Sequence, residues 1–274
     1  MIRNLFLLLF FLATSFAYGQ PKKTNYGNNP INGSYKRING INIYYEIYGD
    51  GRPLVMLHGN GGSIIGQGGR IEYFKQHFKV IAIDSRAHGK SVDATNGSLT
   101  YEQMAYDIKV LLDSIRIDSA YVWGQSDGGI LGLLLAINYP NKVARLATFG
   151  ANIFPGRKAV FDEINKMVID TLKLTKDNYT KRLFSLMAYQ PHITDKQLAE
   201  IKCPVLIMTG DRDAVRLEHS IKIFESIPNS NLFVMPGATH FGSYQKPQLF
   251  NTVLFDFFNS PFSKRSTVDI LIGK

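Results

Sequence analysis

The chain has 274 residues, of which 45% are hydrophobic and 19% charged, and its formal net charge is +9. This length allows one large domain or two small ones, and the hydrophobic content excludes an intrinsically disordered protein. The basic residues are scattered, with no Arg/Lys run interleaved with aromatics. We therefore expect no nucleic-acid partner.

Residues 1–19 have the pattern of a secretory signal peptide. Arg3 supplies a positive start, LFLLLFFLA is an apolar run too short for an ordinary membrane helix, and AYG at 17–19 offers a small-x-small cleavage site. An uncleaved N-terminal anchor is the alternative. The single cysteine, Cys203, cannot form an internal disulfide, and we expect it to be a buried thiol. These features predict an exported bacterial protein, periplasmic or secreted, with no stable membrane insertion after cleavage.

Strand patterns recur along the chain after a polar start. Residues 20–32 are rich in Asn, Gly and Pro and predict a loose N-terminal linker. Asn39-Gly40, between two runs with β character, is a strong hairpin signal. Continuous apolar runs follow, as in strands buried on both faces of a parallel sheet. The expected strands are 34–38, 41–49, 53–59, 78–84, 120–124, 145–150, 204–210 and 231–237.

Helical patterns alternate with these strands. TYEQ at 100–103 has the pattern of a capping box and predicts an amphipathic helix to about Ile115. Further helices are expected at 128–139, 217–227 and 248–258. Alternation of this kind predicts an α/β fold whose mostly parallel sheet is covered on both faces.

One stretch interrupts the alternation. Residues 151–200 are helical and amphipathic in pattern, and they are too long for an ordinary connection. We predict a small helical cap inserted over the carboxyl ends of the strands. The predicted core then comprises 33–150 and 201–262, followed by a C-terminal tail at 263–274.

The stretch GQSDG at 124–128 matches G-x-S-x-G, with a strand pattern before it and an apolar helix after it. Glycines flank a serine in this way because the turn from strand to helix is tight and strained. The hydroxyl then projects at a helix N-terminus, where developing negative charge is favoured. Ser126 is therefore the candidate nucleophile, and a plain serine in a glycine-rich turn is the alternative.

Two further motifs accompany this one, HGNGG at 58–62 and DSRAHGKS at 84–91, each after an apolar run. With the three in this order, residues 34–260 resemble the α/β-hydrolase superfamily. The motif at 84–91 is similar to the family's D-x-R-G-x-G-x-S, with Ala87 in place of the usual glycine. The resemblance implies an α/β-hydrolase fold, with a mostly parallel eight-stranded sheet, helices on both faces and a small helical cap.

The resemblance also implies a catalytic triad. The family carries its histidine in the loop after the last strand, which is the position of His240. It places the acid three residues after the glycine that ends the preceding strand, which selects Asp213 and leaves Asp211 as a turn-forming carboxylate. Some relatives carry the acid one strand earlier, but Asn152 in that loop is an amide and cannot stabilise an imidazolium ionically. The expected catalytic order is Ser126, Asp213, His240.

The other histidines have lesser expected roles. His58 is similar to the loop-shaping histidine of the family's HG motif, and His88 belongs to the loop at 84–91. For His77, His192 and His219 we expect surface positions.

An oxyanion hole needs two N–H donors. One should be the backbone of Asp127, and the resemblance assigns the other to Asn60, with Gly61 as the fallback and a substrate contact. The Ser-Asp-Gly-Gly form is similar to valacyclovir hydrolase and its relatives, in which the acid beside the serine recognises an amino group. Asp127 is thus a candidate substrate-binding residue. The alternative, which we favour, is a carboxylate stabilised at a helix N-terminus.

These residues predict a serine hydrolase that cleaves carboxylic esters of small molecules through an acyl-enzyme. The sequence implies no metal or organic cofactor, since it has no H-E-x-x-H, cysteine cluster or dinucleotide glycine fingerprint. The alternatives on the same fold are an aminopeptidase or aminoacyl-ester hydrolase and a C–C bond hydrolase. A non-catalytic ligand-binding module belongs to a different class. The sequence makes no prediction of oligomeric state.

Overall fold

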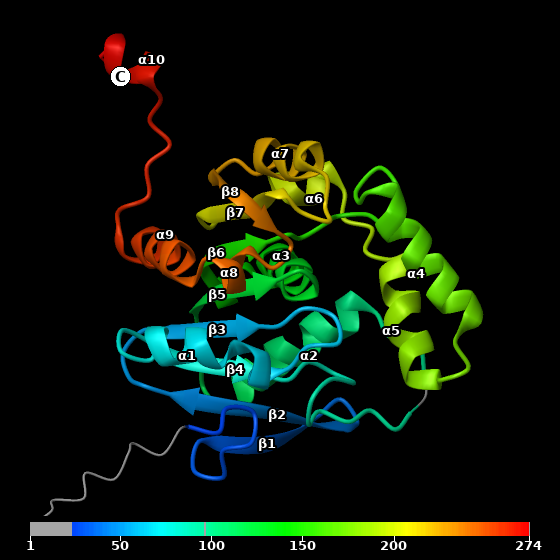
Figure 1. Ribbon diagram of the computed structural model, residues 1–274. Helices are drawn as coiled ribbons and strands as arrows, with labels where there is room; N and C mark the ends of the chain where they lie inside the picture. The colour runs from blue at the N-terminus through cyan, green and yellow to red at the C-terminus, as the bar shows by residue number, and fades with distance from the viewer. Residues whose placement is uncertain (1–23, 96, 274) are drawn as a thin grey trace, which may run out of the picture.

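The computed structural model describes residues 24–95 and 97–273, and the signal peptide predicted at 1–19 lies outside them. Eight strands form one sheet in the order β1-β2-β4-β3-β5-β6-β7-β8 (Figure 1). The strands are β1 (Gly33–Ile38), β2 (Ile41–Tyr48), β3 (Pro53–Leu57), β4 (Lys79–Ile83), β5 (Ala120–Gln125), β6 (Val143–Phe149), β7 (Val205–Arg212) and β8 (Ser230–Thr239).

The sheet is antiparallel at one edge and parallel elsewhere. β1 pairs with β2 and β2 with β4 in antiparallel fashion, and every other neighbouring pair is parallel. The β1–β2 hairpin turns at Asn39 and Gly40, which both have positive φ, as a two-residue hairpin turn requires. The predicted α/β class with a mostly parallel eight-stranded sheet is confirmed.

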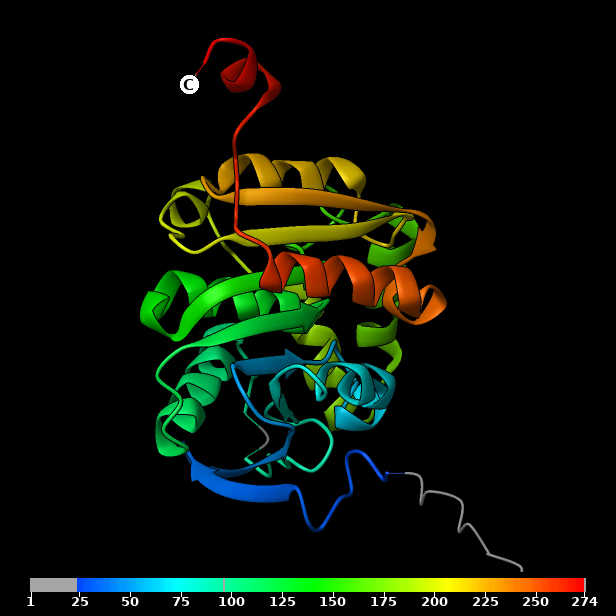
Figure 2. The same ribbon diagram turned by 90° about the vertical axis from the view of Figure 1, so that its left-hand side faces the viewer.

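Helices cover both faces of the sheet (Figure 2). Helices α1 and α9 pack on one face, and α2, α3 and α7 pack on the other. Alternate residues of β3 enter the two hydrophobic clusters, Leu54 and Met56 on the first face and Val55 and Leu57 on the second. This explains why the central strands are apolar at every position. The helices on the faces are α1 (Gly68–Phe74), α2 (Tyr101–Ser114), α3 (Asp127–Asn138), α7 (Leu217–Ser226) and α9 (Pro247–Asn259).

The chain between β6 and β7 is helical. It forms α4 (Asp162–Leu174), α5 (Asn178–Tyr189) and α6 (Asp195–Ala199). Figure 1 shows α4 and α5 beside the edge of the sheet at which the arrowheads of β3 and β5 end. The predicted insertion at 151–200 falls on these helices.

Short helices join the remaining elements. These are η1 (Ile64–Gln67), η2 (Pro140–Lys142), α8 (Gly242–Gln245) and α10 (Thr267–Leu271). Helix α10 lies in the predicted C-terminal tail and has no buried residue. Within residues 24–95 and 97–273, no helix is both long and apolar enough to span a bilayer.

The predicted linker is not loose where the structure describes it, from residue 24 onward. The side chain of Glu46 on β2 is fully buried and needs hydrogen-bond donors. It accepts the backbone N–H groups of Gly27 at 2.8 Å and Asn29 at 2.9 Å, and the hydroxyl of Tyr48 at 2.8 Å. The buried carboxylate therefore fastens the N-terminal segment to the sheet, an interaction that the polar composition of the segment does not reveal.

Candidate active site

Ser126 lies in the turn between β5 and α3, with φ 52° and ψ −116°. A non-glycine residue with positive φ is strained, and such strain is concentrated at functional sites. The flanking glycines permit the turn. A Cβ on Gly124 would lie 2.0 Å from the carbonyl oxygen of Gly128, and one on Gly128 would lie 2.3 Å from that of Leu57. The strand, turn and helix expected around G-x-S-x-G are all present.

Asp213 follows β7 and faces His240. Its Oδ1 accepts the Nδ1–H of His240 at 2.6 Å and the N–H of Val215 at 3.1 Å, and its Oδ2 accepts the N–H of Gly210 at 3.3 Å. Burial alone would raise the pKa of Asp213, but the hydrogen bond and charge of His240, with the two backbone donors, hold that pKa below its ordinary value. The carboxylate is therefore charged at neutral pH and binds the Nδ1–H of the ring, which leaves Nε2 of His240 as the nitrogen that can accept a proton.

Asp211, the other acid of this loop, is turned away from His240. It is exposed and accepts the backbone N–H groups of Gly237 at 2.9 Å and Ala238 at 3.1 Å. This geometry agrees with the turn-forming role expected for Asp211, and Asp213 is the acid that bonds to His240.

His240 lies beside the elbow. Its carbonyl oxygen accepts the Nε2–H of Gln125, the residue before Ser126, at 2.7 Å. A Cβ on Gly150 would lie 2.7 Å from Cε1 of His240 and 3.2 Å from Oδ2 of Asp213, so the end of β6 packs directly under the pair. Among the described residues, no hydrogen bond joins Oγ of Ser126 to His240. In free enzymes such bonds are often long and tighten when substrate binds.

The loop at 58–62 lies against the elbow on the opposite side. A Cβ on Gly59 would be 3.2 Å from Cβ of Ser126. The side chain of Asn60 donates from Nδ2 to Oδ2 of Asp127 at 2.9 Å, which brings the two predicted oxyanion residues together. Their backbone N–H groups have no acceptor among the described residues. Gly61 adopts φ 66°, with open space where a Cβ would stand.

The carboxylate of Asp127 is enclosed. The residue is 4% exposed, Asn60 donates a hydrogen bond to it, and the buried Tyr101 lies near enough to interact with it electrostatically. The same Asn60 Nδ2 also donates to the carbonyl oxygen of Leu183 on α5 at 3.4 Å. Burial raises the pKa of Asp127, against the opposing effects of Asn60 and of the nearby His88. Tyr101 is a site residue that the sequence indicated only as part of a capping box.

His58 supports the loop at 58–62. His58 donates from Nδ1 to the carbonyl oxygen of Gly59 at 2.8 Å and accepts the N–H of Ser85 on Nε2 at 3.1 Å. Burial, with a smaller effect of His88, lowers the pKa of His58 to about 3, so its ring is neutral. Its contacts agree with the loop-shaping role expected for it.

The surface position expected for His219 is wrong. His77 and His192 are exposed, but His219 is 3% exposed and its Nε2 accepts the N–H of Ile153 at 3.0 Å. Helix α7 turns this ring inward against the chain that leaves β6, and burial lowers the pKa of His219 to about 4. Cys203 is half-buried rather than buried, and burial raises the pKa of its thiol to about 11.

A buried group of charges ties the loop after β4 to α5. Arg86 bonds from Nε to Oδ2 of Asp107 at 2.6 Å, and its Nη1 lies 3.4 Å from Oδ2 of Asp93. Arg182 on α5 donates from Nη2 to the same oxygen of Asp93 at 2.7 Å. Both guanidinium groups are thus neutralised by carboxylates of this chain.

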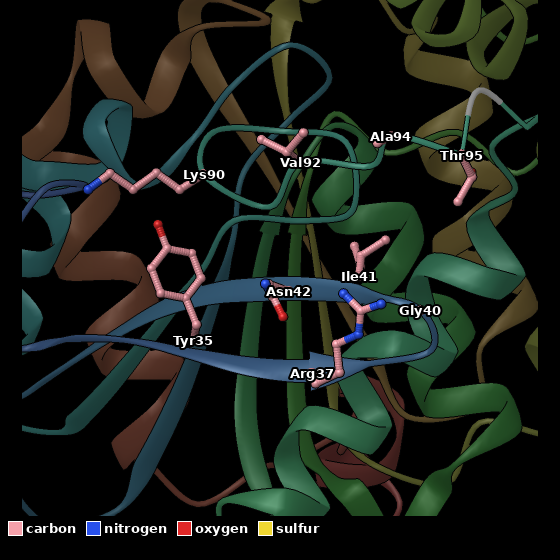
Figure 3. Close-up of a pocket in the computed structure, with 9 residues that line it drawn as sticks. All are labelled: Tyr35, Arg37, Gly40, Ile41, Asn42, Lys90, Val92, Ala94 and Thr95. Carbon is pink, nitrogen blue, oxygen red and sulfur yellow. The ribbon is translucent and has the colours of Figure 1, made fainter.

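A groove of about 600 Å³ lies apart from Ser126, between the β1–β2 hairpin and residues 90–95 (Figure 3). None of the predicted catalytic or oxyanion residues lines it. Its lining residues are Tyr35, Arg37, Gly40, Ile41, Asn42, Lys90, Val92, Ala94 and Thr95.

Comparison with known proteins agrees with this arrangement. Residues 52–179 match the family model described as alpha/beta hydrolase fold. A 2-hydroxy-6-oxononadienedioate/2-hydroxy-6-oxononatrienedioate hydrolase of Pseudomonas putida is 24% identical over 261 residues, covering 79% of this chain and 92% of that protein. An α/β-hydrolase from a Medee basin deep-sea metagenome library has a similar structure, with a TM-score of 0.74 at 20% identity, covering 85% of this chain and 100% of that one. The enol-lactonase of Burkholderia xenovorans LB400 has a TM-score of 0.70 at 19% identity, covering 83% and 100%. Its motifs, its fold and the family match over residues 52–179 show that the chain has the α/β-hydrolase fold and is similar to hydrolases of that superfamily.

Proposed function

We propose that this hydrolase cleaves carboxylic esters of small molecules with Ser126, His240 and Asp213 as its catalytic triad. The observation that carries the proposal is the 2.6 Å hydrogen bond from His240 to the buried carboxylate of Asp213, beside a serine held at positive φ. A serine hydroxyl is a weak nucleophile unless a base removes its proton, and the base needs an orienting carboxylate.

In the proposed reaction, Oγ of Ser126 attacks the acyl carbon while its proton passes to Nε2 of His240. The carbonyl oxygen becomes an oxyanion and accepts the free backbone N–H groups of Asn60 and Asp127. The tetrahedral intermediate then expels the alcohol, which takes the proton from His240. Water repeats the sequence on the acyl-enzyme and releases the carboxylic acid, and Asp213 stabilises the imidazolium in both halves.

C–C bond hydrolysis is the second candidate, because relatives such as the Pseudomonas putida hydrolase are named for it. A dioate, the substrate for which that hydrolase is named, has two carboxylates, which require cationic partners. Here the residue after the nucleophile is an acid, Asp127. Two of the three buried arginines among the described residues, Arg86 and Arg182, are already paired with carboxylates, and the third, Arg70, is packed against the rings of Trp123 and Tyr244. These charges favour an ester without carboxylates over a dianionic substrate.

Replacing Ser126 tests the proposal. Ser126→Ala should reduce turnover of p-nitrophenyl acetate at least about 10⁴-fold and abolish labelling by a fluorophosphonate, with the fold retained in circular dichroism. Ser114→Ala is the matched control, since that hydroxyl bonds only to the carbonyl of Leu111 within α2. Undiminished turnover by Ser126→Ala refutes the assignment, and tight binding of esters by a wild-type chain without turnover supports a binding module instead.

The role of Asp127 is a separate question within this proposal. Its carboxylate is enclosed, accepts a hydrogen bond from Asn60 and lies near Tyr101, so we propose that it supports the oxyanion loop and does not bind a substrate ammonium. Asp127→Asn should then lower kcat/KM for p-nitrophenyl acetate and for the p-nitrophenyl ester of alanine by the same factor. A loss confined to the aminoacyl ester, by about tenfold or more, would show that Asp127 recognises the amino group.

A further inference from the structure

We propose that Arg70, Ser243 and Gln125 form a buried chain of hydrogen bonds that positions His240 relative to Ser126. The catalytic meaning of this chain depends on the proposed triad, although its structural effect does not. Arg70 donates from Nη1 to Oγ of Ser243 at 3.2 Å, and Ser243 donates to Oε1 of Gln125 at 2.8 Å. Gln125 donates from Nε2 to the carbonyl oxygen of His240 at 2.7 Å.

The direction of the chain is fixed by the chemistry of its first member. A guanidinium has donors and no acceptor, so Ser243 must accept from Arg70 and use its single proton elsewhere. That proton goes to Oε1 of Gln125, which turns the amide so that Nε2–H points at the carbonyl of His240. Each group thereby sets the orientation of the next, and reversal of the glutamine amide would place two acceptors face to face at His240.

The surroundings of Arg70 indicate that it is held in place. The residue is 4% exposed, and its guanidinium lies between the rings of Trp123 at 4.6 Å and Tyr244 at 4.2 Å. It forms no salt bridge with a described carboxylate, so the aromatic faces, Ser243 and the carbonyl of Gly66 at 3.5 Å offset its burial. Ser243 and Tyr244 both belong to α8, directly after His240, and Arg70 therefore fixes that helix at two points.

Gln125 connects the two loops that flank the nucleophile. It is 5% exposed and precedes Ser126 directly, and a Cβ on Gly59 would lie 3.8 Å from its Cγ. Asp213 fixes the imidazole of His240 at Nδ1, and Gln125 fixes the same residue at its backbone. Because the bond from Ser126 to His240 is not formed in the free protein, a small shift of the backbone decides whether it forms with substrate bound.

The test removes the middle link, which is the smallest change that interrupts the chain. We expect Ser243→Ala to lower kcat for p-nitrophenyl acetate about 10- to 100-fold with KM nearly unchanged, since only alignment is lost. Gln125→Met should do the same, and the double variant should lose no more than the larger single loss. Ser226→Ala is the matched control, because its hydroxyl bonds to the carbonyl of Lys222 on a distant helix.

Hydrogen–deuterium exchange gives a readout independent of turnover. Peptides covering 238–246 should exchange at least about tenfold faster in Ser243→Ala and Gln125→Met than in the wild type and in Ser226→Ala. Arg70→Lys keeps the charge but not the planar fork, and should have an intermediate effect.

Unchanged exchange in 238–246 overturns the positioning role whatever the activity. A lower melting temperature with unchanged kcat shows that the chain serves stability alone. A wild-type protein without ester turnover contradicts the proposed function, and faster exchange in the variants would then still support the positioning.

Discussion

The two sides of Ser126 are built in opposite ways. On the histidine side, the groups proposed to act in the reaction are the side chains of Asp213 and His240. They are supported at the backbone, where Gln125 donates to the carbonyl oxygen of His240. On the oxyanion side, the proposed donors are backbone N–H groups, and the support is a side-chain contact between Asn60 and Asp127. The difference teaches where substitution is informative. A substitution of Asp213 or His240 deletes a side chain proposed to take part in the reaction, whereas one of Asn60 or Asp127 alters only the contact that holds the backbone donors.

The largest effect is expected on the histidine side. Asp213→Asn keeps the shape of the acid but favours the wrong tautomer of His240 and cannot stabilise the imidazolium, so kcat for p-nitrophenyl acetate should fall about 10⁴-fold. Asp211→Asn is the matched control, two residues away and bonded only to backbone N–H groups, and should change kcat less than about threefold. Equal losses in the two variants would remove the basis for assigning Asp213.

How far the sequence predicts this site depends on where the partners of each residue lie in the chain. Ser126, Asp213 and His240 each follow the end of an apolar strand, and parallel strands bring such ends to one edge of the sheet. The partners of Gln125 and Arg70 follow no such rule. Gln125 meets Ser243 across 118 residues, and Arg70 meets it across 173. Helices α1 and α8 have seven and four residues, too few for an apolar period to predict either the helix or the direction of its side chains.

The same limit explains the errors on His219 and on residues 24–32. The buried imidazole of His219 accepts a backbone N–H, and the segment 24–32 is attached through two backbone N–H groups to the buried carboxylate of Glu46, although most of its residues lie at the surface. Neither interaction leaves a pattern in the local sequence, since any residue supplies a backbone N–H. Local composition therefore predicts neither the burial of His219 nor the attachment of residues 24–32 to the sheet.

As the pH falls, the contribution of the oxyanion side to the stability of the fold should be lost at a higher pH than that of the histidine side. The pKa of His58 beneath the oxyanion loop is about 3, below the value near 6.5 of an unfolded histidine, so its contribution is complete above pH 6.5 and is lost as the pH falls towards 3. The lowered pKa of Asp213 makes its contribution persist until the pH falls below the ordinary aspartate range. We expect the free energy of unfolding in urea to decrease by on the order of 3 kcal/mol from pH 6.5 to 4 through His58 alone.

His58→Gln isolates that contribution, because glutamine is uncharged in this range and has both a donor and an acceptor for Gly59 and Ser85. The variant should be less stable than the wild type at pH 8 and should lose less stability between pH 6.5 and 4. His192→Gln, at an exposed histidine, should leave the pH profile unchanged. Parallel profiles for wild type and His58→Gln would mean that protonation of His58 does not weaken the oxyanion side.

The smallest effect concerns a second strained residue, on the oxyanion side. Ala87 has φ 61°, close to the 52° of Ser126, in the loop whose Ser85 binds His58. Ala87→Gly relieves about 1–2 kcal/mol of strain from the left-handed backbone conformation. It also loses a buried methyl group and increases the entropy of the unfolded chain, and these two costs together are about as large as the strain relieved. Its free energy of unfolding should therefore stay within about 0.5 kcal/mol of the wild type. Ala105→Gly, buried within α2, has no strain to relieve and should cost about 1–2 kcal/mol. Similar losses in urea unfolding for Ala87→Gly and Ala105→Gly would show that Ala87 carries no strain. Of Ala87 and Ser126, only Ser126 would then be held against its preferred backbone conformation.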